Sequence, residues 1–139
     1  MGILDTKDLE ELEKEVIRLA RSYPKETKKF LQKQGNKLKA RAIKKAKSKL
    51  KEKTGNYLKG FKRGKVYKYK EEEDTVRVYN YMPHAHLIEY GHRIVGKNGK
   101  EHGFKKGHFI LEEARSEFQD EFIKAADNFV DDIIKKGGF

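Results

Sequence analysis

The chain has 139 residues, of which 40% are charged and only 36% hydrophobic, and its formal net charge is +11. A chain of this length is expected to form a single domain over residues 1–139, with a small core. It has no cysteine and no apolar run of about 20 residues, which excludes disulfides, cysteine-based catalysis or metal binding, and a helical membrane span.

Two helices are predicted at the N-terminus. Apolar residues recur at spacings of three and four at Leu9, Leu12, Val16, Leu19 and Ala20. This period predicts an amphipathic helix within residues 1–23. Tyr23-Pro24 interrupts it, because proline disfavours a helical residue before it but fits the first turn of a new helix.

The second helix is expected over residues 24–53 and is rich in lysine. Its narrow apolar stripe consists of Leu31, Leu38, Ala42, Ala46 and Leu50. Gly35 lies inside this helix and indicates a kink or a tight crossing, since glycine is unfavourable in a helix interior. Thr54-Gly55-Asn56 is expected to end the helix, with glycine in the left-handed closing position.

Residues 54–91 are expected to hold a small antiparallel sheet and a short helix. Residues 65–69 and 75–79 alternate and are rich in β-branched and aromatic side chains, which predicts two strands joined at the acidic run 71–74. Met82-Pro83-His84 ends the second strand. Residues 85–90 then form a short helix that Gly91 closes.

Residues 92–107 contain four glycines and an Asn98-Gly99 pair, the strongest short hairpin-turn signal. We expect a mobile loop or a short ribbon there, which orders on a partner during assembly. A long C-terminal helix is expected within residues 108–139. The fold class is therefore α+β, with two N-terminal helices, a small antiparallel sheet and a long C-terminal helix.

The C-terminal helix carries apolar residues at helical spacing: Phe118, Phe122, Ala126, Phe129 and Ile133. We expect Phe118 and Phe122 inside the protomer, and Phe129 and Ile133 nearer the edge as a candidate interface. The outer acids of this helix are expected to complement the basic helix of a neighbouring subunit. These acids are Glu117, Asp120, Glu121, Asp127 and Asp131.

Charge is unevenly placed along the chain. Residues 24–70 hold 19 Lys or Arg and two acids, whereas residues 109–139 hold four basic and eight acidic residues. Lysine-dominated surfaces favour phosphate without reading sequence. The candidate DNA-facing residues are Lys44, Lys45, Lys47 and Lys49. The alternative to a DNA-binding surface is a helix whose lysines are simply exposed to solvent and bind no partner.

The five histidines fall within 25 residues: His84, His86, His92, His102 and His108. Catalytic zinc needs three converging ligands and an open position. The chain has neither a His-Glu-x-x-His pattern nor a cluster of acids suited to magnesium, so we expect no metal site. His108 is expected to start or cap the final helix, and His84 and His86 to be turn residues.

Glu89 is the one acid in an apolar and aromatic stretch. It is either a general acid or base with a raised pKa, or a structural carboxylate, and we favour the structural role. Its expected partner is Arg93, His108 or a backbone donor. No nucleophile-base-acid arrangement and no phosphate-binding glycine loop is present, so we expect neither catalysis nor a cofactor.

One group of residues carries a family resemblance: Tyr81, Ala85, Leu87, Ile88, Glu89, Tyr90 and Gly91, then His108, Phe109, Ile110 and Ala114. Together with Thr54-Gly55-Asn56-Tyr57-Leu58, this pattern resembles the signature of tail-component proteins of long-tailed phages and prophages, a family of head-tail joining and tail-completion proteins. The resemblance extends from about residue 25 to residue 130.

The resemblance implies a non-enzymatic structural protein of the virion, made in the host cytoplasm. Its place is the head-tail junction or the proximal tail, where such proteins act as homo-oligomeric rings against neighbouring connector and tail proteins. The basic helix would then face DNA in the channel. The alternative reading is a nonspecific nucleic-acid-binding protein or a small nuclease of a mobile element.

Overall fold

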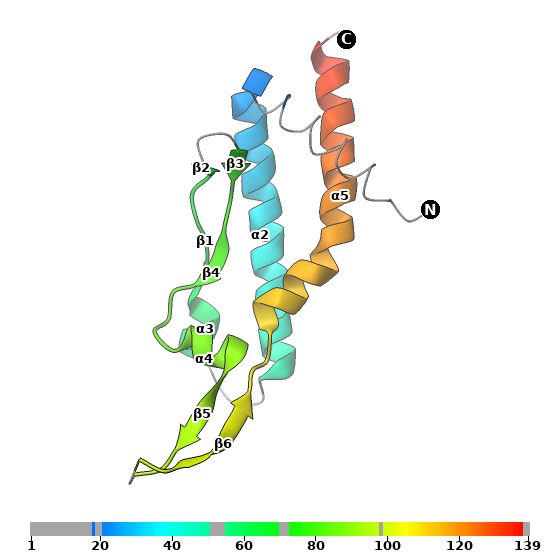
Figure 1. Cartoon of the computed structure of the whole chain (residues 1–139). Coiled ribbons are helices and arrows are strands. Elements are labelled where there is room, and N and C mark those ends of the chain that lie inside the picture. Colours follow the sequence, from blue (N-terminus) through cyan, green and yellow to red (C-terminus); the bar gives the residue numbers. More distant parts are fainter. Residues whose placement is uncertain (1–17, 19–20, 51–54, 70–72, 98, 138–139) are drawn as a thin grey trace.

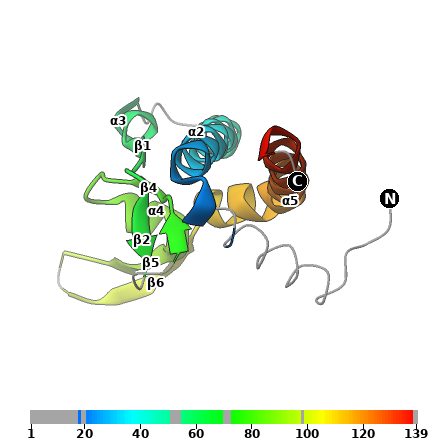
Figure 2. The same ribbon diagram turned by 90° about the horizontal axis from the view of Figure 1, so that it is seen from above.

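The computed structural model describes residue 18 and residues 21–50, 55–69, 73–97 and 99–137 (Figure 1). The helix predicted within residues 1–23 therefore lies almost wholly outside the described residues. Two long helices, α2 (Pro24–Lys49) and α5 (Ile110–Gly137), run side by side in opposite directions. The strands that follow α2 lie on its other side, as the view from above also shows (Figure 2). The fold is α+β, as the sequence predicts.

Helix α2 begins where proline allows it to. Pro24 occupies the first turn, and Thr27 donates from both its N–H and its hydroxyl to the Tyr23 carbonyl. The helix ends at Lys49, since Leu50 already has an extended backbone (φ −96°, ψ 115°) and packs against the core. The predicted end at residue 53 is thus too late. Gly55 does not close α2 but begins a separate short helix, α3 (Gly55–Lys59).

The strands form one long interrupted hairpin of two antiparallel ladders: β1 (Phe61–Arg63) with β4 (Val78–Asn80), and β2 (Tyr67–Tyr69) with β3 (Glu73–Thr75). Gly64 bridges the two ladders by donating its N–H to the Arg77 carbonyl over 2.8 Å. The predicted pairing of residues 65–69 with residues 75–79 is correct in direction. Strand β1, whose first residue Phe61 is buried, was not predicted from the sequence.

Helix α4 (Ala85–Tyr90) ends at Gly91, whose φ of 87° lies in the region that favours glycine. Two strands follow, β5 (Gly91–Val95) and β6 (Glu101–Lys106), and they pair as a hairpin. Of the two expected forms, a mobile loop or a short ribbon, the structure has the ribbon. This hairpin extends away from the helices at the lower end of the molecule in Figure 1.

The core at the lower half of the molecule is built around small residues. Its buried members are Ala42, Ala46, Tyr57, Phe61, Ile110 and Ala114. Alanine on both helices lets α2 and the start of α5 approach closely, because no long side chain separates them. Gly35 has a similar role further up the same stripe of α2, seven residues before Ala42. A Cβ there would lie 2.9 Å from the Arg63 side chain, which agrees with the predicted tight crossing.

Aromatic rings fill the space between α2 and the upper part of α5. Phe30 stacks on Phe129 with ring centroids 4.6 Å apart and lies 6.0 Å from Phe122. Phe118 is buried, as expected, and Phe122 and Phe129 are half-buried. The expectation for Ile133 is wrong: it is 3% exposed. It shares the inner side of α5 with buried Ala126 and Val130, seven and three residues earlier, so its side chain is not free for a partner.

Candidate functional site

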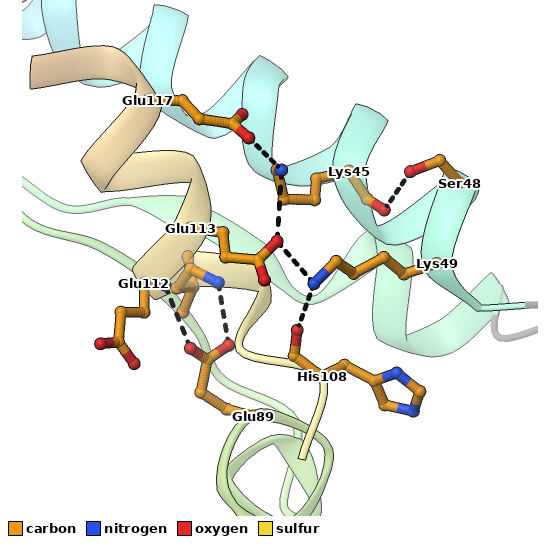
Figure 3. A network of polar contacts seen from close by, with 9 residues as sticks. Lys45, Ser48, Lys49, Glu89, His108, Glu112, Glu113 and Glu117 are labelled. Atoms are coloured by element: carbon orange, nitrogen blue, oxygen red, sulfur yellow. Dashed lines mark hydrogen bonds and ion pairs between the residues drawn. The ribbon is translucent and has the colours of Figure 1, made fainter. Parts of the chain in front are cut away.

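Glu89 is a buried carboxylate that caps helix α5. Its Oε1 accepts a hydrogen bond from the Leu111 N–H (2.9 Å), and its Oε2 accepts one from the Glu112 N–H (3.1 Å). The first N–H groups of a helix have no partner within the helix, and the positive end of the helix dipole favours an anion there. Of the three expected partners, the structure therefore gives the backbone donor. Figure 3 shows the carboxylate facing the start of α5.

The segment around Glu89 also anchors the β5–β6 hairpin at its base. The backbone N–H of His108 donates to the Ile88 carbonyl (2.8 Å), and that of Phe109 donates to the Glu89 carbonyl (3.0 Å). Phe109 has a φ of 48°, an unusual value for a residue with a side chain, and it turns the chain into α5. The two ends of the hairpin are thus held together on α4.

Two glycines make this close approach possible. A Cβ on Gly107 would meet backbone atoms of Glu89, Tyr90 and Gly91 well inside van der Waals contact. A Cβ on Gly91 would equally meet the backbone of Lys105 and Gly107. Backbone lies against backbone here, which only glycine permits. The hairpin is consequently fixed in direction relative to the helices.

His108 does not have the capping role that we expected. Its ring points away from the polar network, and the cap of α5 is Glu89 (Figure 3). The His108 carbonyl instead accepts a hydrogen bond from the Lys49 ammonium group at 2.8 Å. The turn before α5 is thereby tied to the end of α2.

A ladder of ion pairs joins α2 to α5. Lys45 contacts Glu117 (2.6 Å) and Glu113 (3.3 Å), and Lys49 contacts Glu113 (Figure 3). Arg41 pairs with Glu121 further up the helices and covers the Phe118 ring. The basic and acidic members both recur every fourth residue, so antiparallel helices bring them into register.

The pKa values of two members follow from these contacts. The hydrogen bond from Lys45 to Glu117, with a further one to Glu113, raises the pKa of Lys45. The hydrogen bond from Lys49, with a second one from Lys45, lowers the pKa of Glu113. Both shifts favour the charged forms, so Lys45 and Glu113 form an ion pair at neutral pH.

This ladder corrects two expectations about charged surfaces. Lys45 and Lys49 are engaged with α5 and are not a DNA-facing pair; Lys44 and Lys47 remain exposed. Glu117 and Glu121 likewise complement the basic helix of their own chain, not that of a neighbouring subunit. The remaining outer acids of α5 are Asp120, Asp127 and Asp131.

The β5–β6 hairpin exposes three apolar side chains: Val95 and Phe104 have 61% and 62% of their surface exposed, and Ile94 has 42%. Tyr90, the last residue of α4, is 64% exposed and directly precedes the hairpin. All six residues of β6 are exposed. An exposed cluster of apolar side chains on a projecting element is typical of a surface that meets another protein.

The histidines do not converge with acids. Within the described residues no group of three or more His, Asp or Glu side chains is arranged to hold a metal ion. Among the helices of that same part of the chain, none is long and apolar enough to cross a membrane.

Several residues of this site were not predicted from the sequence. The ladder had a signal, since Arg41, Lys45 and Lys49 share the four-residue spacing of Glu113, Glu117 and Glu121. Gly107 had none, because a glycine in a polar loop does not reveal which backbone it will face. The exposure of Ile94, Val95 and Phe104 was also missed, because isolated apolar residues carry no period.

Residues 10–91, more than half of the chain, match the family described as "Bacteriophage HK97-gp10, putative tail-component". The match runs through α2, the interrupted hairpin and α4 and stops at Gly91. Comparisons with curated proteins and with solved structures gave no match. The resemblance at His108, Phe109 and Ala114 lies beyond the matched residues and stays an expectation. The chain therefore belongs to the HK97-gp10-like family of phage tail components.

Proposed function

We propose that the protein acts in virion assembly at the head-tail junction or at the proximal end of the tail. It works there as a homo-oligomeric ring that contacts neighbouring connector and tail proteins, and it has no catalytic role. Membership of a tail-component family supports the virion as its destination. Before assembly, the protein resides in the host cytoplasm.

The observation that carries this proposal is the projecting β5–β6 hairpin on a fixed base. Its strands expose apolar side chains to solvent, which is unfavourable for an isolated protein but useful for one that is buried in an assembly. The contacts of Glu89, Gly91 and Gly107 hold its direction before any partner arrives. A preoriented element loses less conformational entropy on binding.

The polar contacts support a structural role over a chemical one. Glu89 lies in an apolar stretch of the sequence, and each of its two carboxylate oxygens accepts a hydrogen bond from a backbone N–H group of α5. Glu113 is held by two lysines. A general base must be within reach of a substrate proton. Glu89 is only 5% exposed, and the two lysines hold Glu113 in its charged form, which weighs against that role for both carboxylates.

Nonspecific contact with DNA is a second candidate function, supported by a different face of α2. Lys33, Lys37, Lys44 and Lys47 are exposed and share one side of the helix. None of them pairs with an acid among the residues that the structure describes. They therefore replace Lys45 and Lys49 in the proposed phosphate-facing set.

The DNA proposal predicts loss of duplex binding when Lys33, Lys37, Lys44 and Lys47 are all changed to Glu. The control carries the same change in net charge at exposed sites elsewhere, at Lys59, Lys62, Lys65 and Lys136. Binding is measured by fluorescence anisotropy across a salt series, because phosphate contacts weaken as salt rises. Equal affinities for the two variants would remove DNA from the proposal.

The junction proposal is tested by inactivating the gene in an inducible lysogen and imaging the lysate by electron microscopy. The expected products are DNA-filled heads and separate tails, which join when the protein is supplied from a plasmid. Normally joined virions in the inactivated strain would contradict the proposal.

A further inference from the structure

One face of the β5–β6 hairpin combines an aromatic ring with two cations. Arg93 and Phe104 are directly opposite each other in the antiparallel register, and Lys106 lies two residues after Phe104 on the same face. All three are exposed, Phe104 to 62%. Val95, 61% exposed, follows Arg93 by two residues on β5, across an irregularity in the register with β6. We call Arg93, Val95, Phe104 and Lys106 the hairpin face.

Helix α5 presents a surface of opposite sign. Asp127, Asp131 and Ile134 follow one another at spacings of four and three residues, so they share one side of the helix. Both acids are exposed, and neither forms an ion pair within the described part of the chain. Ile134 is 38% exposed, and no other large apolar side chain among the described residues of α5 is classed as exposed. We call Asp127, Asp131 and Ile134 the helix stripe; Lys124 flanks it.

The two surfaces lie at opposite ends of the molecule. The hairpin leaves the lower end of the structure in Figure 1, whereas the last turns of α5 form its upper end. From Asp120 to Ile134 alone the helix rises by about 21 Å, at 1.5 Å per residue. One chain cannot bring its own hairpin face onto its own helix stripe. A contact between them must join two copies.

We infer that the hairpin face of one copy binds the helix stripe of the next copy. Arg93 and Lys106 meet Asp127 and Asp131, while Phe104 and Val95 cover Ile134. The contact is heterologous, because different surfaces of the two copies meet, and repetition gives a ring or a filament. This inference deepens the proposed function and rests on it, since it names the surfaces that would build the ring.

The hairpin is a better partner for the helix stripe than the lysine face of α2 is. Lys33, Lys37, Lys44 and Lys47 offer charge, but α2 exposes no large apolar side chain in the described residues. Solvent-exposed ion pairs contribute little binding free energy on their own, whereas burial of apolar surface drives association. The hairpin face supplies both in one place.

Charge reversal tests the contact with two variants. Arg93→Glu/Lys106→Glu reverses the hairpin face, and Asp127→Arg/Asp131→Arg reverses the helix stripe. Each variant alone faces like charges and should associate at least tenfold more weakly than the wild type. An equimolar mixture of the two restores opposite charges at every contact, so association should return. Sedimentation equilibrium at low salt, up to millimolar chain, measures the mass.

The matched control is Lys44→Glu/Lys47→Glu, which reverses two exposed charges outside both surfaces and should associate as the wild type does. Circular dichroism checks that every variant keeps its helix content. A wild type that stays monomeric at all concentrations overturns the inference. So does a mixture that remains as weak as its components, or single variants that associate normally.

A second measurement locates the contact directly. The chain has no cysteine, so Phe104→Cys and Ile134→Cys give single reactive sites. Mixing these two variants under oxidation should yield a disulfide-linked dimer faster than either variant yields its own dimer. Equal rates would overturn the inference. The proposed function fails independently, if inactivation of the gene leaves virions joined.

Discussion

Glu89 shows how a single buried residue can hold several elements of the fold together. Its side chain caps α5 through Leu111 and Glu112, and its backbone carbonyl holds Phe109 at the base of the hairpin. A single residue thus joins α4, the hairpin and the last helix. From the sequence, a lone acid among apolar residues has two readings, catalytic and structural. Only the position of the backbone donors decides between them.

Replacement of Glu89 by Gln should destabilise the fold by about 1.5 to 3 kcal/mol, the usual contribution of a hydrogen bond to a charged group. The amide keeps one acceptor oxygen but presents an N–H₂ group to the second helix N–H. Urea unfolding followed by circular dichroism measures the free energy of unfolding. Glu112→Gln, an exposed acid in the same turn, is the control and should have a much smaller effect. Equal effects would contradict the capping role.

Ionisation of Tyr57 should lower the stability of the fold at alkaline pH. Burial, aided by the charge of Glu89, raises the pKa of Tyr57 to about 12 from its ordinary value of 10.0. Because the pKa of Tyr57 is higher in the folded protein than in the unfolded chain, ionisation of its hydroxyl favours unfolding. The stability that depends on the neutral hydroxyl is complete below pH 10 and is lost as the pH rises through about 12. At about 1.4 kcal/mol per unit, the loss is of the order of 2 to 3 kcal/mol.

Tyr57→Phe removes the titrating hydroxyl and keeps the ring that packs on Phe61. Its free energy of unfolding should therefore fall less steeply than that of the wild type between pH 10 and pH 12. Urea unfolding at a series of pH values measures the difference. Parallel curves for the two proteins would show that Tyr57 does not titrate across unfolding.

Among the secondary-structure elements, the sequence predicted those with a strong local signal. Helix α4 and its closing Gly91, the start of α2 at Pro24 and the apolar period of α5 each follow from nearby residues. Strand β1 was not predicted, because three residues are too few to show an alternation of apolar and polar side chains. The end of α2 was misplaced, because the backbone of Leu50 is set by packing and not by helix propensity.

The candidate site depends on which elements become neighbours in the fold, and this was not predicted from the sequence. The outer acids of α5 and the basic residues of α2 were correctly expected to attract each other. The expectation assigned the contact to two subunits, whereas the antiparallel helices make it within one chain. Spacing along a helix defines a face, but it does not define what that face meets.

The hairpin base gives a sharp test at the level of elements. Gly107→Ala places a Cβ against the backbone of Glu89 and Tyr90, which cannot move aside, so we expect a large loss of thermal stability. Gly55→Ala is the control, because no atom lies within 4 Å of its Cβ position and Gly55 is in helix α3. It should be neutral or stabilise by up to about 1 kcal/mol.

Differential scanning fluorimetry ranks the two variants against the wild type. A Gly107→Ala protein that melts like the wild type would mean that the two strands do not meet α4 as closely as the structure has them. The anchored hairpin would then lose its physical basis.

The whole molecule is a helix pair locked by ion pairs, with strands on one side of α2 and a hairpin projecting from one end (Figures 1 and 2). Three of its exposed apolar side chains, Ile94, Val95 and Phe104, lie on the hairpin, away from the core that stabilises the fold. The core that stabilises the fold and the surface that we propose for partner contact are therefore different parts of the chain. A change at the hairpin tip should alter assembly without altering stability.

Deletion of residues 97–101, which connect β5 to the rest of β6, tests this central claim most directly. The variant is supplied in place of the wild-type protein during prophage induction, and joined virions are counted by electron microscopy. Purified in parallel, it should melt cooperatively within a few degrees of the wild type while joined virions fall to the level of the inactivated gene. Joined, infectious virions in normal number, or loss of the cooperative transition, would contradict the account.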